Sequence, residues 1–297
     1  GPVGLVFGAP GDPLGEGLLL SGGEFLVRRG GPHHLVGLVG QDAPQHFTGG
    51  RVAGDDGPAL QQGRGEALTE HPVAGDAAPG LAAAQADASV RVILIQGSAT
   101  CFTAGNDLQD FLQQPPAGES APVFRFLQAI ATAQLPVVAA VAGPAVGIGT
   151  TMLLHCDLVY AAPNARFQLP FVSLGLVPEA ASSVLFPALV GYQRAAEYLL
   201  LGQPFDAHQA QHMGLVNAVI DAEGLLAHAM RVARQLAALP PGALRASKNL
   251  LKRSQHTQVQ DALHIEGAEF RARLAMPEAH EALRAFMEKR PAKFTNS

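Results

Sequence analysis

Two runs of apolar residues have the length and composition of buried strands. Val90–Ile95 (VRVILI) is rich in β-branched residues and is followed by Gly97, and Pro136–Gly143 (PVVAAVAG) has the same character. Runs without polar alternation are typical of strands that are covered on both faces. Small, turn-prone residues follow each run and lead into a helical pattern, so we predict the order strand, turn, helix twice.

Both predicted turns can expose backbone N–H groups. The first turn (FTAGND) enters a helix, where the first peptide N–H groups have no partner in the helix. In the second (PAVGIGTT), Gly147 and Gly149 flank Ile148 and allow the backbone to approach a ligand closely. This GxG lacks the third glycine and the later acidic residue of a dinucleotide site, so we do not expect it to bind phosphate.

Glu179 is a carboxylate in the otherwise apolar segment Phe167–Ser183. Desolvation there would raise its pKa and make it a better proton acceptor near neutral pH. The alternative is an ordinary first-turn helix residue, because Glu after Pro is favoured by the helix dipole. The sequence therefore offers one candidate general base.

Composition excludes several classes of protein. The chain has 297 residues, 48% of them hydrophobic, and a net charge of −5, which argues against a nucleic-acid binder. No uncharged apolar run is long enough to cross a bilayer. Two cysteines and no signal segment indicate reduced thiols and a cytoplasmic location, and no histidine pattern suggests a metal site. His155, Cys156 and Asp157 are consecutive and cannot all face one site, which predicts structural roles.

The ordered motifs FTAGND, AGPAVGIG, CDLVYA and PFVSLGLVPE resemble the crotonase superfamily, the enoyl-CoA hydratase and isomerase fold. The resemblance covers residues 89–296. It implies an α/β spiral of strand–strand–helix units over residues 89–220. Residues 221–297 would then be a helical region that forms a homotrimer or a dimer of trimers.

The resemblance also implies where the substrate binds. In the family, two peptide N–H groups polarise the thioester carbonyl of coenzyme A substrates, and these fall on Asn106 and Ile148. Removing one such donor typically costs about 3 to 4 kcal/mol of transition-state stabilisation. Neighbouring residues of the two turns would line the thioester: Ala104, Gly105, Gly147 and Gly149.

The catalytic carboxylate differs from that of the hydratases. Hydratases of this family use two glutamates, and here those positions hold Thr151 and Phe171, which is a substrate-lining candidate. The LGLVPE segment instead resembles peroxisomal-type Δ3,Δ2-enoyl-CoA isomerases, which use a single glutamate, here Glu179. Coenzyme A is then part of the substrate, and no separate cofactor is expected. Two alternatives stay open: a hydratase or other lyase of the family, and a non-catalytic acyl-CoA-binding or assembly subunit.

The end of the chain carries a further match. All four lysines lie after Asp221, where the pattern is helical, and a solvated helix face is their ordinary explanation. In the family, an aromatic residue and a lysine of the AFxEKR motif reach the adenine and 3′-phosphate of CoA bound to a neighbouring subunit. Phe286 and Lys289 match those positions.

Residues 1–88 fit neither the pattern nor the family. They contain 20 of the 33 glycines and no Ile, Lys, Met, Asn or Tyr. Dense Gly and Pro favour loop or disorder, and a hairpin over residues 30–50 is the alternative. Because the missing residue types need A- or T-containing codons, we also consider partial out-of-frame translation of a GC-rich gene. A divergent extension is the other interpretation.

Overall fold

The computed structural model describes residues 34–39, 73–106 and 108–294. Its main sheet is parallel, with the strand order β1 (His34–Val39), β2 (Val90–Gln96), β3 (Val137–Val141), β5 (Leu158–Ala161) and β8 (Ala218–Val219). The parallel strands need crossover connections, and the helices supply them. The α/β prediction is thereby confirmed.

A smaller sheet lies beside the main one and carries the second glycine-rich turn. It pairs β4 (Pro144–Val146) with β6 (Arg166–Gln168) in parallel, and β6 with β7 (Phe205–Asp206) in antiparallel orientation. Gly143 separates β3 from β4 with φ +66°, and a Cβ added to it would come 1.9 Å from the Thr100 carbonyl oxygen. Only glycine fits this close approach, so the chain can leave one sheet and enter the other there.

Residues of β2 and β3 alternate between two cores. Val92, Leu94, Val138 and Ala140 pack against α8 (Ala222–Ala237), whose buried face includes Leu225 and the alanines 229, 233 and 237. The intervening residues pack on the opposite face of the sheet, with the larger core: Ile93, Ile95, Val137, Ala139 and Val141. Burial on both faces explains why these strands read as continuous apolar runs.

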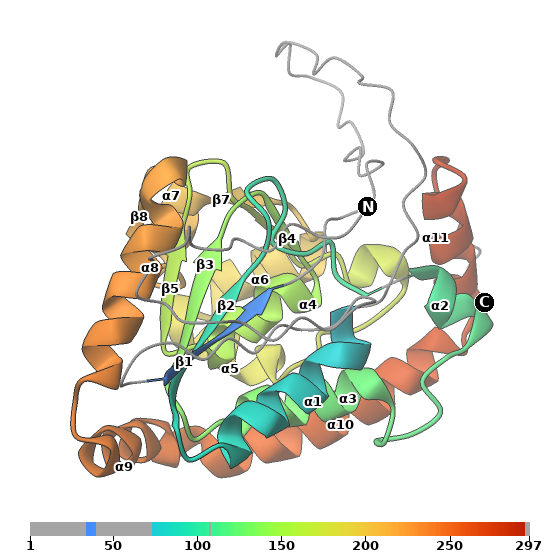
Figure 1. Cartoon of the computed structure of the whole chain (residues 1–297). Helices are drawn as coiled ribbons and strands as arrows, with labels where there is room; N and C mark the ends of the chain where they lie inside the picture. Colours follow the sequence, from blue (N-terminus) through green and yellow to red (C-terminus); the bar gives the residue numbers. More distant parts are fainter. Residues whose placement is uncertain (1–33, 40–72, 107, 295–297) are drawn as a thin grey trace.

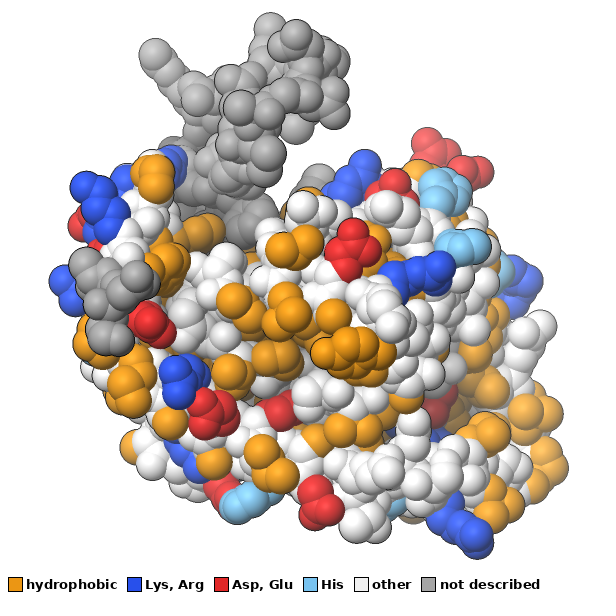
Figure 2. Space-filling view, turned by 180° about the vertical axis from the view of Figure 1, so that it is seen from behind, with side chains coloured by type: hydrophobic (Ala, Val, Ile, Leu, Met, Phe, Trp, Pro, Cys, Tyr) orange, Lys and Arg blue, Asp and Glu red, His pale blue; other side chains and the backbone are white. Residues whose placement is uncertain are grey.

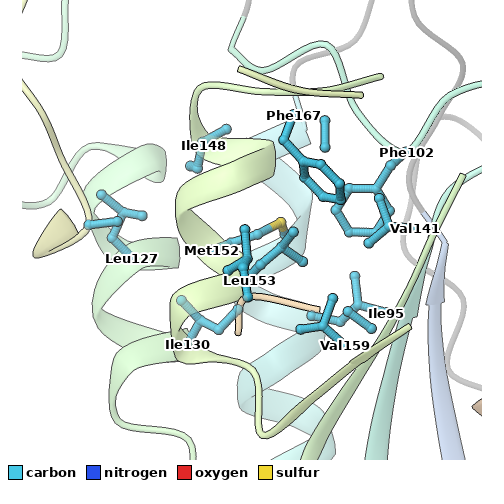
Figure 3. Close-up of a cluster of buried hydrophobic side chains, with 14 of the residues drawn as sticks. Ile95, Phe102, Leu127, Ile130, Val141, Ile148, Met152, Leu153, Val159 and Phe167 are labelled. Carbon is cyan, nitrogen blue, oxygen red and sulfur yellow. The ribbon is translucent and has the colours of Figure 1, made fainter. Parts of the chain in front are cut away.

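The larger core is built around a short central helix. This helix consists of α4 (Ile148–Thr151) and the 3₁₀ turn η1 (Met152–His155), and it lies between α3 (Pro122–Ala131) and the sheet (Figure 3). Met152 and Leu153 are buried there with Leu127 and Ile130 of α3 (Figure 3). The predicted segment TTMLLHC thus forms the predicted short apolar helix.

Helices of the second half surround this centre (Figure 1). Their bounds are α5 Ser182–Val190, α6 Tyr192–Leu201, α7 Ala207–His212, α9 Pro241–Lys252, α10 His256–Leu274 and α11 Pro277–Met287, and the first half adds α2 Leu108–Gln113. Short 3₁₀ turns are η2 (Val172–Leu174) and η3 (Arg253–Gln255). The helix α10 packs against both α3 and α5, which places it under the segment that carries Glu179.

The expectation of loop or disorder throughout residues 1–88 is wrong for α1 (Val73–Ala86) and β1. The helix α1 contains Pro79, and it buries Ala77, Leu81 and Ala84 in the larger core. The strand β1 pairs in parallel with β2, so where this stretch is described it is not a hairpin. The rest of the tract, and with it the choice between the two interpretations, lies outside the described residues.

Candidate functional site

The two predicted turns are joined side by side. Thr103 pairs with Ala145 in a parallel bridge, the Val146 N–H donates to the Thr103 carbonyl at 3.0 Å, and the Thr103 N–H donates to the Pro144 carbonyl at 3.0 Å. Asn106 and Ile148 each lie three residues beyond the bridge on chains that run in the same direction. The structure therefore brings the two predicted amide donors to matching places on neighbouring turns.

Glycine is required where these turns touch. A Cβ on Gly149 would lie 2.5 Å from Thr103 Cγ2, and a Cβ on Gly105, whose φ is +98°, would lie 2.9 Å from the Val146 carbonyl oxygen. Gly147 has φ +55° and nothing within 4 Å of its Cβ position. Two of the glycines thus let the turns pack together, whereas Gly147 faces open space and permits the backbone conformation.

Ile148 is the first residue of α4, with Gly147 as its cap. Its peptide N–H therefore has no partner inside the helix, and within the described part of the chain no acceptor contacts the N–H of Ile148 or of Asn106. The Ile148 side chain is buried, while Ala104 to Asn106 are partly exposed. Two free peptide donors on adjacent turns are the arrangement that stabilises an oxyanion.

Glu179 is buried, with 4% of its surface exposed. Burial raises its pKa from 4.5 to about 8, a hydrogen bond from Thr151 opposes the rise, and the negative charge of Glu266 adds to it. The alternative of an ordinary first-turn residue is wrong, because α5 begins three residues later, at Ser182. The desolvated carboxylate has the properties of a general base.

The two carboxylate oxygens of Glu179 differ. Oε1 accepts a hydrogen bond from the Thr151 hydroxyl at 2.5 Å, whereas Oε2 has no partner in the described part of the chain. Thr151 is the last residue of α4, one turn after Ile148. One short helix therefore carries both a candidate amide donor and the group that orients the candidate base.

The backbone after Glu179 is strained and held in place. Ala180 and Ala181 both have left-handed conformations, with φ +61° and +55°, which cost about 1 to 3 kcal/mol each for residues other than glycine. His155 Nε2 donates to the Ala180 carbonyl at 2.7 Å. Burial lowers the pKa of His155 to about 4, so the ring is neutral at pH 7 and acts as a donor.

Glu266 of α10 holds the same segment from the other side. Its Oε2 accepts from the Ala181 N–H at 2.6 Å and its Oε1 accepts from the Ser183 N–H at 2.9 Å. This residue was not among the candidates predicted from sequence. A sequence signal was available, because Glu266 takes one position in a row of residues spaced by four. The other positions, Ala262, Phe270 and Leu274, are apolar and buried on the same face of α10.

Phe171 and Thr151 are both buried and carry no charge at the two hydratase positions. Phe171 is 5% exposed and belongs to the larger core, and Thr151 is fully buried. Among the described residues, Glu179 and Glu266 are the buried carboxylates, and only Glu179 has an oxygen without a partner. The site thus presents a single available carboxylate.

Phe286 lies in the last turn of α11 and Lys289 lies two residues beyond its end, and both are exposed, Phe286 by 44%. The helix α11 packs on η2 of the same chain, where Gly175 approaches Ala279 so closely that a Cβ would come within 2.7 Å of its Cα. No described contact within one chain joins either side chain to Glu179. Their predicted contact with CoA remains a prediction.

The predicted structural cluster at residues 155–157 separates as expected. His155 binds the Ala180 carbonyl, Cys156 donates weakly to the Met152 carbonyl, and Asp157 pairs with buried Lys248 at 2.7 Å. Across the described ranges, no group of three or more possible metal ligands occurs. In those same ranges, no helix is both long and apolar enough to cross a membrane.

Comparison with known proteins identifies the family. The enoyl-CoA hydratase/isomerase family model matches residues 70–297. The chain is 36% identical over 218 residues to 2,3-dehydroadipyl-CoA hydratase of Escherichia coli (strain K12), covering 72% of this chain and 84% of that protein. It is 34% identical over 206 residues to enoyl-CoA delta isomerase 2 of Rattus norvegicus, covering 67% of this chain and 53% of that longer protein.

A solved structure agrees with the sequence matches. The enoyl-CoA hydratase/isomerase from Pseudoalteromonas atlantica T6c superposes with a TM-score of 0.71 at 42% identity, covering 75% of this chain and 89% of that one. The family match begins at residue 70 and so includes α1, which lies before the motifs that carried the resemblance. The chain belongs to the enoyl-CoA hydratase/isomerase family of the crotonase superfamily and is an acyl-CoA-processing enzyme of that family.

Proposed function

We propose that the protein is a Δ3,Δ2-enoyl-CoA isomerase in which Glu179 moves the proton. Oε2 removes a proton from C2 of the acyl chain, and the electrons pass to the thioester oxygen as a dienolate. The peptide N–H groups of Asn106 and Ile148 stabilise that oxygen. Glu179 then returns the same proton to C4, which shifts the double bond from C3–C4 to C2–C3.

The proposal rests on one observation: Glu179 pairs with a hydroxyl group and not with a second carboxylate. A second carboxylate is absent from the two hydratase positions, and the hydroxyl of Thr151 donates to Oε1. One buried carboxylate with a free oxygen suffices for a proton shuttle within one substrate. The rat delta isomerase is among the similar proteins, which also supports the proposal.

Hydration is the second candidate function, because the E. coli relative is a hydratase. Water addition needs groups that activate water and protonate the α-carbon, and Glu179 would have to do both with Thr151. The non-catalytic alternative is disfavoured, because Glu179 is buried and bonded to Thr151 of α4, the helix that follows the second turn, rather than exposed to solvent.

The binding partners are part of the same proposal. The substrate is an acyl-CoA thioester, whose CoA moiety leaves no need for another cofactor, and the assembly is a trimer or a dimer of trimers. Large apolar side chains that are at least 60% exposed support contacts between subunits: Tyr192, Leu200, Leu201, Leu250, Leu251 and Ile265. In the assembly, Phe286 and Lys289 would reach the adenosine end of CoA.

The experiment that tests the proposal is Glu179→Gln. The amide keeps the shape of the side chain but cannot accept and return a proton, so isomerase turnover should fall by roughly 10² to 10⁴. Binding of a CoA ester should be nearly unchanged, since a lost proton shuttle does not remove ground-state contacts. Glu269→Gln on the exposed side of α10 is the matched control. Full turnover in Glu179→Gln would exclude Glu179 as the base.

A further inference from the structure

We infer that Glu266 is a positioning residue for the reaction: from α10, it fixes the strained backbone that carries Glu179 and sets the electrostatic environment of that carboxylate. The inference rests on the proposed function, because it concerns how the proposed base is held. Glu266 is 85 residues from Ala181 along the chain, and it joins the C-terminal helices to the catalytic segment.

The contacts define what Glu266 does. Both of its oxygens accept peptide N–H groups, one from Ala181 and one from Ser183. Burial raises the pKa of Glu266, and the hydrogen bonds that it accepts from Ser183 and Ala181 oppose that rise and favour the ionised carboxylate. These N–H groups belong to the start of α5, where no side chain of the helix itself acts as a cap. Glu266 therefore supplies the missing cap from another helix.

The backbone conformation explains why a cap is needed here. Ala180 and Ala181 are left-handed, a conformation that persists only where surrounding contacts determine it. His155 secures the Ala180 carbonyl, and Glu266 secures the N–H groups of Ala181 and Ser183. Without Glu266, the segment can relax toward ordinary backbone angles. Glu179 is adjacent to Ala180, so such relaxation would displace its carboxylate.

Electrostatics adds a second, measurable effect. Burial raises the pKa of Glu179, and the negative charge of Glu266 raises it further. Among the described residues, His155 of η1 is neutral, and Lys252 and Lys248 of α9 act on His155. Lys252 donates to the His155 carbonyl and Lys248 pairs with Asp157, so Glu266 is the acidic neighbour of the base. Neutralising it should lower the pKa of Glu179.

Four proteins test the inference: wild type, Glu179→Gln, Glu266→Gln and the matched control Glu269→Gln. Each is checked for folding by circular dichroism, for acetyl-CoA binding by titration, and for kcat and KM as a function of pH. We expect Glu266→Gln to bind acetyl-CoA within about threefold of wild type, which is well under 1 kcal/mol. Its kcat for isomerisation should fall roughly 10- to 100-fold, because a small displacement of a reacting group slows catalysis by about that factor.

The pH profile separates positioning from a merely structural role. The midpoint of kcat/KM should move to lower pH in Glu266→Gln, whereas a structural role would reduce the amount of active protein and leave the midpoint unmoved. Glu269→Gln should match wild type in every measurement. An unmoved midpoint, or a wild-type kcat, in Glu266→Gln would overturn the inference while leaving an inactive Glu179→Gln to support the function. An active Glu179→Gln would instead overturn the function.

Should Glu266→Gln fail to fold, Glu266→Asp takes its place. The aspartate keeps the charge but is shorter by one methylene, so it cannot reach both N–H groups in the same geometry. We expect a lower kcat with the pH midpoint kept. A wild-type kcat in Glu266→Asp would overturn the inference, because the reach of the side chain would then be irrelevant.

Discussion

Burial raises the pKa of Glu179 to about 8 in the folded protein, and this value sets the pH range in which the carboxylate is ionised. A base must be ionised, so kcat/KM for isomerisation should rise with pH and level off above about 8. Measuring kcat/KM from pH 6 to pH 10 checks this. A profile that is already flat at pH 6 would mean that the carboxylate ionises near its ordinary value.

The same pKa has a consequence for stability. Between pH 4.5 and about 8, the folded state binds the proton of Glu179 and the unfolded state does not. The contribution of this group is therefore fully present below pH 4.5 and is lost as pH rises through about 8. Glu179→Gln removes this dependence, so the difference in denaturant stability between variant and wild type should grow in favour of the variant over that range. Parallel stability curves for the two proteins would contradict it.

The hydrogen bond from Thr151 to Glu179 can be tested by substitution. Its hydroxyl lowers the pKa of Glu179 by donating to Oε1. Thr151→Val keeps the volume but removes the donor, so the midpoint of the pH profile should move upward and the rate at pH 7 should drop. Thr151→Ser retains the hydroxyl and is the control. Equal midpoints in the two variants would show that the short hydrogen bond has no effect on the base.

At this scale, the burial of the candidate base could be predicted from sequence, but its contacts could not. An apolar run around Glu179 implied desolvation, and the structure confirms it. Thr151 and Glu266 are 28 and 87 positions away, and their contacts depend on how α4 and α10 pack. Local pattern carries no information on such contacts, which is why Glu266 was missed and Thr151 was noted only as a departure from the hydratases.

At the scale of elements, the two joined turns are the feature that places the amide donors. Gly149→Ala would put a Cβ 2.5 Å from Thr103 Cγ2 and 3.0 Å from its carbonyl oxygen, which pushes the turns apart. Turnover and melting temperature should both fall. Gly242→Ala in α9 is the matched control, because its Cβ meets nothing within 4 Å, and alanine there should stabilise the helix by up to about 1 kcal/mol. A Gly149→Ala enzyme with wild-type turnover would mean that the turns tolerate separation.

Elements with strong local patterns were predictable, and those held by packing were not. Apolar runs bounded by glycine-containing turns predicted the strands β2, β3 and β5 and the short helix α4–η1. The helix α1 was misinterpreted, because alanine-rich sequence with an internal proline lacks an amphipathic pattern. Its burial against α3 and the sheet stabilises it all the same.

At the scale of the whole molecule, we predict that a neighbouring subunit completes the CoA-binding site. Figure 2 shows hydrophobic side chains gathered near the middle of the face opposite to that of Figure 1, and surfaces of this kind occur where subunits meet. The composition of one chain does not show which of its surfaces meets a partner. The trimer therefore rests on family resemblance.

The role of the C-terminal residues can be tested with point variants. Deleting the end of α11 would remove the buried Ala282, Leu283 and Ala285, so a truncation would confound binding with unfolding. We expect Phe286→Ala and Lys289→Ala to weaken CoA esters about tenfold, and pantetheine esters, which lack the adenosine 3′-phosphate, hardly at all. Met287→Ala, with similar exposure, is the control. Equal losses for both kinds of ester would contradict the contact, and light scattering of the same samples gives the oligomeric state.

The most direct test of the proposed function compares two rates on one preparation. The wild-type enzyme is given a 3-enoyl-CoA, whose isomerisation is followed, and crotonyl-CoA, whose hydration is followed. Among the described residues Glu179 is the one buried carboxylate with a free oxygen, and Thr151 and Phe171 stand at the hydratase positions. Isomerisation should therefore be far faster than hydration, and Glu179→Gln should slow it by roughly 10² to 10⁴. Hydration at a comparable or higher rate would contradict the assignment and make the enzyme a hydratase.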